Sequence, residues 1–249
     1  MVQPPHDAEV PPAVLILFDI DATLLTTSRA GVYAMLDAGR DLHGEAFHIE
    51  NMDFAGRLDP LIIADMLRLN GVEPDAARMA AFRERYGRRL EERLTASPVA
   101  RALPGVLELL ERLDPRAATG AVSLGLLTGN FPETGERKLR AALIEPERFT
   151  VRAWGCDSPH DPPAREHLPA VAMTRHREVH GREIRGEDIT IIGDTPHDVS
   201  CALAHGCRVL GVGTGGFSAD DLMGVGAHHA VDSLADVEAI EAWLINTTR

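Results

Sequence analysis

The sequence is poor in lysine and cysteine. Lys138 is the single lysine, so cationic roles elsewhere in the chain must fall to arginine. The three cysteines, Cys156, Cys201 and Cys207, are too far apart for a CxxC pair, and one thiol is left over if two join. This usage is typical of a reducing compartment with ordinary buried thiols.

Long apolar runs and a recognisable secretion signal are also missing. No stretch approaches the roughly 20 apolar residues that a membrane-spanning helix needs. The N-terminal residues MVQPPHDAEVPP are acidic and rich in proline, unlike a signal peptide. We therefore expect a soluble, cytoplasmic protein without a membrane partner.

Positive charge is scarce as well. The chain has 25 Lys and Arg residues against 38 Asp and Glu residues, which gives a formal net charge of −13. Such a surface repels a polyanion, so we expect no nucleic-acid partner. A small phosphorylated metabolite stays compatible, because a local group of cations or a metal ion can override the overall field. No feature of the sequence sets the oligomeric state.

Four short apolar runs predict buried strands. They are residues 13–19 (AVLILFD), 121–128 (AVSLGLLT), 189–193 (ITIIG) and 207–212 (CRVLGV). Continuous runs of this length are typical of parallel strands that are covered on both faces. Helical patterns at residues 133–143 and 197–205 follow two of these runs. We therefore predict an α/β fold with a doubly wound parallel sheet, which binds ligands beyond the carboxyl ends of its strands.

Residues 26–100 have a different hydrophobic pattern, and this pattern predicts no strand. Apolar residues recur there at helical spacing, as in Leu61, Ile62, Met66 and Leu69. A helical insertion at this point would lie over the strand ends as a lid. We predict a helical cap at residues 26–100, inserted into an α/β catalytic core that comprises residues 1–25 and 101–249. A helix at residues 104–113 returns the chain to the core.

The strongest chemical signal is FDIDATLL, which places Asp19 and Asp21 at the end of the first strand. Two carboxylates two positions apart on an extended chain point to the same side. A solvated turn is one interpretation of this pattern. The other is a site, because an apolar strand has no structural use for paired charges. Such a pair forms a hard-oxygen pocket for Mg²⁺, and one carboxylate can attack an electrophile.

Acidic and polar residues also follow the two later strands. In IIGDTPHDVSCA, Asp194 ends a strand at the same edge as Asp19, whereas Asp198 could be only a helix cap. Carboxylates that converge there repel one another unless a cation lies among them. The segment LLTGN ends in Thr128, Gly129 and Asn130. These three residues could cradle phosphate oxygens or form an ordinary turn.

Together these elements resemble the haloacid-dehalogenase-like superfamily, which carries DxDxT, a strand-terminal Ser/Thr, a basic residue and GDxxxD in that order. The resemblance implies that Asp19 is the nucleophile, Asp21 the general acid and base, and Thr128 a phosphate-binding hydroxyl. It also implies that Mg²⁺ is bound by Asp19, Asp194 and the backbone carbonyl of Asp21, while Asp198 supports the site. The helical insertion matches the place of the family's C1-type cap.

The basic residue of this pattern has several candidates. Arg165 lies roughly midway between Thr128 and Asp194, which fits the spacing of the family. Lys138 follows Thr128 too closely and should lie on the intervening helix. Other nearby arginines remain open as rivals; they are Arg152, Arg175 and Arg177.

Two further segments carry the resemblance less directly. Ala22 replaces the usual glycine of DxDGT, and we expect this loop to keep a negative φ. DFAGRLDP resembles the AGRxD stretch of phosphoglycolate-phosphatase-like members, which implies that Gly56 and Arg57 reach the substrate. The alternative is that Arg57 is solvated or paired with Asp53 or Asp59.

The resemblance implies a Mg²⁺-dependent phosphatase that hydrolyses a small phosphomonoester through an aspartyl-phosphate intermediate. A sugar phosphomutase shares all four motifs and is the first alternative. A catalytically silent binding module is the second, although such a scaffold has no reason to keep mutually repelling acids. Asp21 disfavours a dehalogenase, and the absence of a cap lysine disfavours a phosphonatase.

Overall fold

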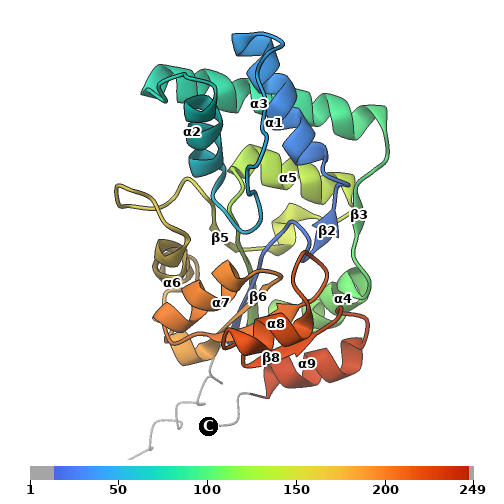
Figure 1. Cartoon of the computed structure of the whole chain (residues 1–249). Helices are drawn as coiled ribbons and strands as arrows, with labels where there is room; N and C mark the ends of the chain where they lie inside the picture. Colours follow the sequence, from blue (N-terminus) through green and yellow to red (C-terminus); the bar gives the residue numbers. More distant parts are fainter. Residues whose placement is uncertain (1–13, 247–249) are drawn as a thin grey trace, which may run out of the picture.

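The computed structural model describes residues 14–246 (Figure 1). The proline-rich segment and Ala13, the first residue of the first expected strand, lie outside this range. Within it, no helix combines the length and apolarity needed to cross a membrane. The expectation of buried thiols is confirmed for Cys201 and Cys207, whereas Cys156 is exposed.

A parallel sheet of six strands in the order β5-β4-β1-β6-β7-β8 forms the centre of the core. The strands are β1 (Val14–Phe18), β4 (Val122–Leu127), β5 (Val151–Ala153), β6 (Ile189–Gly193), β7 (Arg208–Val212) and β8 (His229–Val231). The four strands expected from apolar runs are present and adjacent. The sequence pattern missed β5 and β8, the edge strands, because three residues are too few to show a pattern.

Helices cover both faces of this sheet, and the first strand shows why its residues are apolar throughout. Ile16 and Phe18 pack in one cluster with side chains of α4, α5 and α9, whereas Leu15 and Leu17 pack in another with α6, α7 and α8. Alternate side chains of a strand point to opposite faces, so both faces of β1 are buried. The predicted doubly wound α/β core is confirmed. Its helices are α4 (Val106–Ala118), α5 (Pro132–Ala141), α6 (Leu168–His180), α7 (Pro196–Ala204), α8 (Ala219–Gly224) and α9 (Val237–Ile245).

The insertion between β1 and β4 is helical, as predicted, and lies at one end of the molecule (Figure 1). Its helices are α1 (Ala30–His43), α2 (Asp59–Leu69) and α3 (Ala76–Ala96). They share an apolar cluster of their own, in which Ala34, Ile63 and Phe82 are almost completely buried. The inserted helical cap is therefore a packed unit above the carboxyl ends of the strands.

The two connections between cap and core run side by side. Strand β2 (Leu25–Thr26) pairs antiparallel with β3 (Arg101–Ala102). The boundary predicted at residues 25/26 falls within β2 and the one at 100/101 directly precedes β3, and we propose them as the domain limits. The remaining elements are 3₁₀ helices at η1 (Pro146–Arg148), η2 (Arg165–His167) and η3 (Gly186–Asp188).

Candidate active site

A cavity of about 440 Å³ lies between the strand ends and the cap. Its core side is polar and includes Asp19, Asp21, Asn130, Arg165 and Asp194. Its cap side combines apolar and charged side chains, which are Val32, Met35, Met52, Phe54 and Ile62 together with Arg29, Asp53, Arg57 and Asp59. The position agrees with the rule that open α/β sheets bind ligands beyond the carboxyl ends of their strands.

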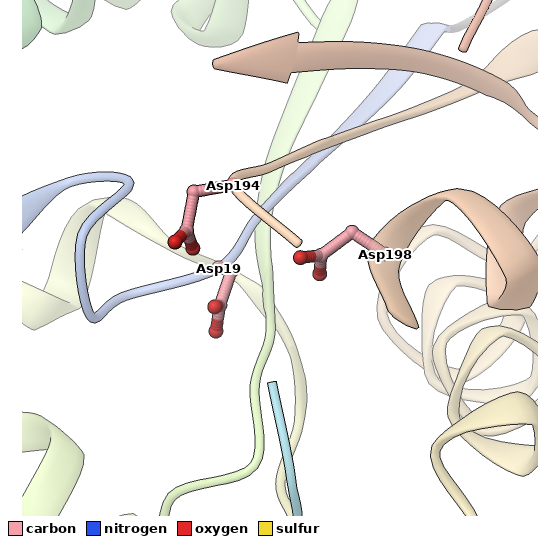
Figure 2. A group of neighbouring side chains, drawn as sticks. All are labelled: Asp19, Asp194 and Asp198. Carbon is pink, nitrogen blue, oxygen red and sulfur yellow. The ribbon is translucent and has the colours of Figure 1, made fainter. Parts of the chain in front are cut away.

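Three buried carboxylates lie close together (Figure 2), and two of them, Asp19 and Asp194, line the cavity. Asp19 follows β1, Asp194 follows β6, and Asp198 lies in the first turn of α7. Each offers a carboxylate oxygen, and these oxygens all lie within 4.8 Å of one another. Asp19 and Asp194 meet because β1 and β6 are hydrogen-bonded neighbours, and the backbone N–H of Asp19 donates to Ile192 O over 2.9 Å.

Two acids of this cluster, Asp19 and Asp194, have pKa values above the usual range of a carboxyl group. Burial raises the pKa of Asp19 to about 6, although the nearby Arg165 guanidinium opposes this rise. Burial likewise raises the pKa of Asp194 to about 8, and the charges of Asp198 and Asp19 add to it. Buried carboxylates of this kind fit a divalent cation with a preference for oxygen ligands, such as Mg²⁺.

Asp198 differs from the other two acids because its hydrogen bonds are already made. Its Oδ2 accepts from the backbone N–H and hydroxyl of Thr195, forming a capping box, and its Oδ1 accepts from Arg165 Nη2 over 2.5 Å. Asp194 Oδ1 accepts only a longer bond of 3.3 Å, from the Thr23 hydroxyl. Asp19 and Asp194 are therefore the carboxylates that fit a metal, and Asp198 fits a supporting role.

Arg165, the first residue of η2, is the arginine that reaches the acid cluster. Its Nη2 lies 3.3 Å from Asp19 Oδ1, and its Nη1 donates to the Gly56 carbonyl of the cap over 3.1 Å. The three rivals pair with acids elsewhere. Their partners are Glu136 for Arg152, Asp157 for Arg175 and Glu183 for Arg177.

The TGN loop reaches the cavity through two of its three residues. Gly129 and Asn130 line the cavity, whereas the Thr128 side chain is completely buried and its hydroxyl accepts from Asn130 Nδ2 over 3.2 Å. Asn130 Nδ2 also donates to Asp21 Oδ2 over 2.9 Å. A Cβ atom at Gly129 would lie 2.0 Å from the Arg57 carbonyl oxygen, so only glycine fits beneath the cap here.

The AGRLD loop of the cap, residues 55–59, contacts the core through its backbone and through the Asp59 side chain. The Asp59 N–H donates to Gly129 O over 2.7 Å, and Asp59 Oδ2 accepts from Phe131 N over 3.2 Å. Arg57 lines the cavity, but its Nη2 lies 2.5 Å from Asp65 Oδ2. The expected acidic partners were Asp53 and Asp59; Asp53 contributes only its backbone carbonyl to Arg57, over 3.1 Å.

The expectation of a negative φ at Ala22 is wrong. Its φ is 58°, which is the left-handed region that favours glycine. After Asp21 the chain reverses sharply, since the backbone N–H groups of Thr23, Leu24 and Leu25 all bond to Ile20 O. Such a tight reversal requires the left-handed conformation whichever residue stands there.

Lys138 is the site residue that the sequence reasoning missed. It lies on α5 as expected, yet its Nζ is 2.5 Å from Asp21 Oδ2 and its side chain is only 5% exposed. A signal was present in the spacing, because Lys138 shares the apolar face of α5 with Gly135, Leu139 and Ala142. A lysine at a core-facing position indicates a buried acidic partner.

Solved structures with the same fold come from several bacteria. A predicted phosphoglycolate phosphatase from Haemophilus somnus has 20% identity and a TM-score of 0.65, and covers 91% of this chain and 97% of that one. CbbY from Rhodobacter sphaeroides, solved with phosphate, has 21% identity and a TM-score of 0.68, and covers 90% and 95%. A candidate β-phosphoglucomutase from Bacteroides vulgatus has 17% identity and a TM-score of 0.65, and covers 97% and 92%.

Sequence comparison identifies the family. No curated protein sequence matches the chain significantly. The model of the haloacid dehalogenase-like hydrolases matches residues 16–203, a range that includes every acid of the cluster and the whole cap. This chain therefore belongs to the haloacid dehalogenase-like hydrolase family.

Proposed function

We propose that this hydrolase is a Mg²⁺-dependent phosphatase that cleaves a small phosphomonoester through a phosphorylated Asp19. The observation that carries the proposal is the position of Asp19. It is buried at the end of β1, lines the cavity, and has Arg165 Nη2 3.3 Å from its Oδ1. A carboxylate with a neighbouring guanidinium can attack phosphorus while the cation offsets charge on the phosphoryl oxygens.

The metal would be held by the carboxylates of Asp19 and Asp194 and by the backbone carbonyl of Asp21. Mg²⁺ would supply charge neutralisation and would orient the phosphoryl group. The fit rests on the buried oxygens of Asp19 and Asp194, which lie within 4.8 Å of each other, and a bound cation would offset the burial that raises the pKa of Asp194 to about 8.

The protein residues divide the remaining work between two steps. In the first, Asp19 attacks phosphorus while Asp21 donates a proton to the leaving alcohol oxygen. In the second, Asp21 takes a proton from water, which attacks the phosphorus and releases phosphate and free Asp19. Asp21 suits this role because it lines the cavity and its side chain is 44% exposed, so a leaving group and water can both reach it. Backbone N–H groups of the Gly129 loop and Arg165 would bind the phosphoryl oxygens.

The size of the cavity supports a small substrate. A volume of about 440 Å³ beneath the cap fits a metabolite rather than a macromolecule. The relative solved with phosphate, CbbY, supports phosphate chemistry on this fold. A sugar phosphomutase is the second candidate, favoured by the likeness to the candidate β-phosphoglucomutase.

Phosphate release from a panel of phosphomonoesters, with and without Mg²⁺, tests the proposal. The panel includes phosphoglycolate and sugar phosphates. We expect release that requires Mg²⁺ and that falls by about 10⁴-fold or more in Asp19→Asn, as for loss of a catalytic nucleophile. Asp114→Asn is the control, because this acid pairs with Arg148 outside the cavity. Isomerisation of a sugar phosphate without phosphate release would identify a mutase, and binding of Mg²⁺ without any turnover would favour a silent module.

A further inference from the structure

The single lysine of the chain occupies a position where lysine is rare. Lys138 projects from α5 into the interior, and only 5% of its side chain is exposed. A buried ammonium ion persists only when it is paired, because desolvation of an isolated charge is very unfavourable. Its partner is Asp21, with 2.5 Å between Nζ and Oδ2.

This pairing acts on one oxygen of Asp21. Oδ2 accepts from Lys138 Nζ and, over 2.9 Å, from Asn130 Nδ2, whereas no group within residues 14–246 donates a hydrogen bond to Oδ1. The Asp21 side chain is 44% exposed, so without these donors it would sample several rotamers. Two donors on one oxygen hold the carboxylate in place and leave the other oxygen free for proton transfer.

The cap encloses the ammonium from the opposite side. A Cβ atom on Gly31 of α1 would lie 3.4 Å from Lys138 Nζ and 3.5 Å from the Tyr86 hydroxyl of α3. Tyr86 is completely buried, and its hydroxyl has no hydrogen-bond partner among residues 14–246. Core and cap therefore meet at Lys138, where the cap covers the ammonium group while Asp21 stays open to the cavity. An ion pair is stronger in such surroundings than in water, because less solvent screens it.

We propose that Lys138 is a positioning residue for Asp21, and that the cap controls it by shielding the Lys138 ammonium group from water. With the cap seated on the core, the pair holds Asp21 in place for proton transfer. When the cap lifts, water reaches the ammonium and the hold on Asp21 weakens. This inference rests on the proposed phosphatase function, in which Asp21 protonates the leaving group.

The sensitivity of the reaction to the leaving group tests the positioning role. An alkyl phosphate needs a proton on its leaving oxygen, whereas p-nitrophenyl phosphate has a stable leaving group and needs none. In Lys138→Met we expect kcat/KM for the alkyl phosphate to fall about 30- to 100-fold, which is a large part of the rate enhancement that a general acid supplies. For p-nitrophenyl phosphate we expect less than about a threefold change. Equal losses for both esters, or no loss for either, would overturn the role.

Two further variants make this test specific. Arg140→Met removes a positive charge from the same helix at an exposed position that pairs with Glu147, and we expect no change for either ester. Asp21→Asn should reproduce the leaving-group pattern. If Lys138 acts through Asp21, the double variant Lys138→Met/Asp21→Asn loses no more than Asp21→Asn alone. Additive losses would contradict action through Asp21.

A nuclear magnetic resonance experiment tests the pair without any substrate. Selective ¹⁵N-lysine labelling gives one side-chain signal, because the chain has one lysine. We expect slowly exchanging ammonium protons in the wild type and fast exchange in Asp21→Ala. Exchange as fast as in free lysine in the wild type would overturn the pairing. If the wild type hydrolyses neither ester, the proposed function fails, while this experiment still decides whether the pair exists.

A variant of the cap tests whether the cap shields the Lys138 ammonium group. Tyr86→Leu leaves Lys138 and Asp21 in place but thins the wall around the ammonium. We expect exchange of the ammonium protons to be about tenfold faster, as for a site that opens more often. The value of kcat/KM for the alkyl phosphate should fall while that for p-nitrophenyl phosphate persists. Unchanged exchange in a folded Tyr86→Leu variant would remove the cap from the proposal.

Discussion

The core side and the cap side of the cavity differ in how their charges are compensated. On the core side, Asp19, Asp194 and Asp198 converge, and Arg165 contacts two of these acids. On the cap side, Arg57 already has a carboxylate partner in Asp65, and the apolar part of the wall is interrupted by Arg29, Asp53 and Asp59. The outer charges of the cap also pair with each other across α1 and α3. These pairs are Asp41 with Arg89 and Asp37 with Arg93.

This difference separates two roles. On the core side, burial and neighbouring acids raise the pKa of Asp194, and binding of a metal would stabilise its charged form. The cap side carries charges of both signs among apolar side chains, and it contributes the shape of the cavity and the exclusion of water. The AGRLD loop joins the two sides, because its backbone contacts Gly129 and Arg165 of the core.

The largest expected effect comes from separating the two sides. In Gly129→Ala, the new methyl group would lie 2.0 Å from the Arg57 carbonyl, so the cap loop must move. We expect kcat/KM to fall about 100-fold, the usual result of a displacement of about 1 Å in an active site. Gly216→Ala is the control, since Gly216 also lines the cavity but a Cβ there meets nothing within 4 Å. Similar kinetics for both variants would show that the cap contact does not matter for catalysis.

The raised pKa of Asp194 predicts how the stability of the fold depends on pH. Because the folded pKa of Asp194, about 8, exceeds its unfolded value, its protonation stabilises the fold at low pH. That contribution is lost as the pH rises through about 8. In the absence of metal, we expect Asp194→Asn to be more stable than the wild type at pH 9 by about 1 to 3 kcal/mol, and similar at pH 4.

Chemical denaturation at both pH values, with and without Mg²⁺, measures this effect. Mg²⁺ should stabilise the wild type more at pH 9 than at pH 6, and should have little effect on Asp194→Asn. Asp220→Asn, at an exposed position on α8, serves as the control. A metal-free wild type that is most stable at high pH would contradict the raised pKa of Asp194.

A smaller effect tests whether the cap side contributes charge to binding. Arg57→Met should raise KM for phosphoglycolate about tenfold, or 1.4 kcal/mol, if the guanidinium also contacts a second anionic group. The KM for a phosphate ester without that group should stay unchanged. Arg68→Met is a matched control, because Arg68 also pairs with Asp65, over 3.1 Å, but does not line the cavity. Equal KM values for both variants would leave Arg57 as a structural partner of Asp65.

The smallest effect concerns the backbone beneath the nucleophile. Ala22 has a φ of 58°, which glycine adopts without steric strain. We expect Ala22→Gly to raise the free energy of unfolding by up to about 1 kcal/mol. Leu143→Gly tests the same gain at an exposed position with a φ of 62°, outside the cavity. A loss of stability in Ala22→Gly alone would show that the alanine methyl group contributes to packing.

Several features of the fold and site follow from local sequence. The four central strands were predictable because burial on both faces requires a continuous apolar run, as in β1 and β6. The cap helices were predictable from apolar spacing. The convergence of Asp19 and Asp194 followed from their positions at the ends of neighbouring parallel strands. The edge strands β5 and β8 were not predictable, since each has three residues.

By itself, the sequence determined the α/β core, the inserted helical cap and the acids at the strand ends, because these depend on apolar periodicity and strand polarity. Only the tertiary structure decided which cationic side chains pair with the acids. Among the candidate arginines, Arg165 contacts Asp19, and Lys138 donates to Asp21 although 117 positions separate them. It also decided the left-handed conformation of Ala22 and the pairing of Arg57 with Asp65. Partners of this kind depend on the packing of helices against the sheet, which brings distant residues together without leaving a periodic trace in the sequence.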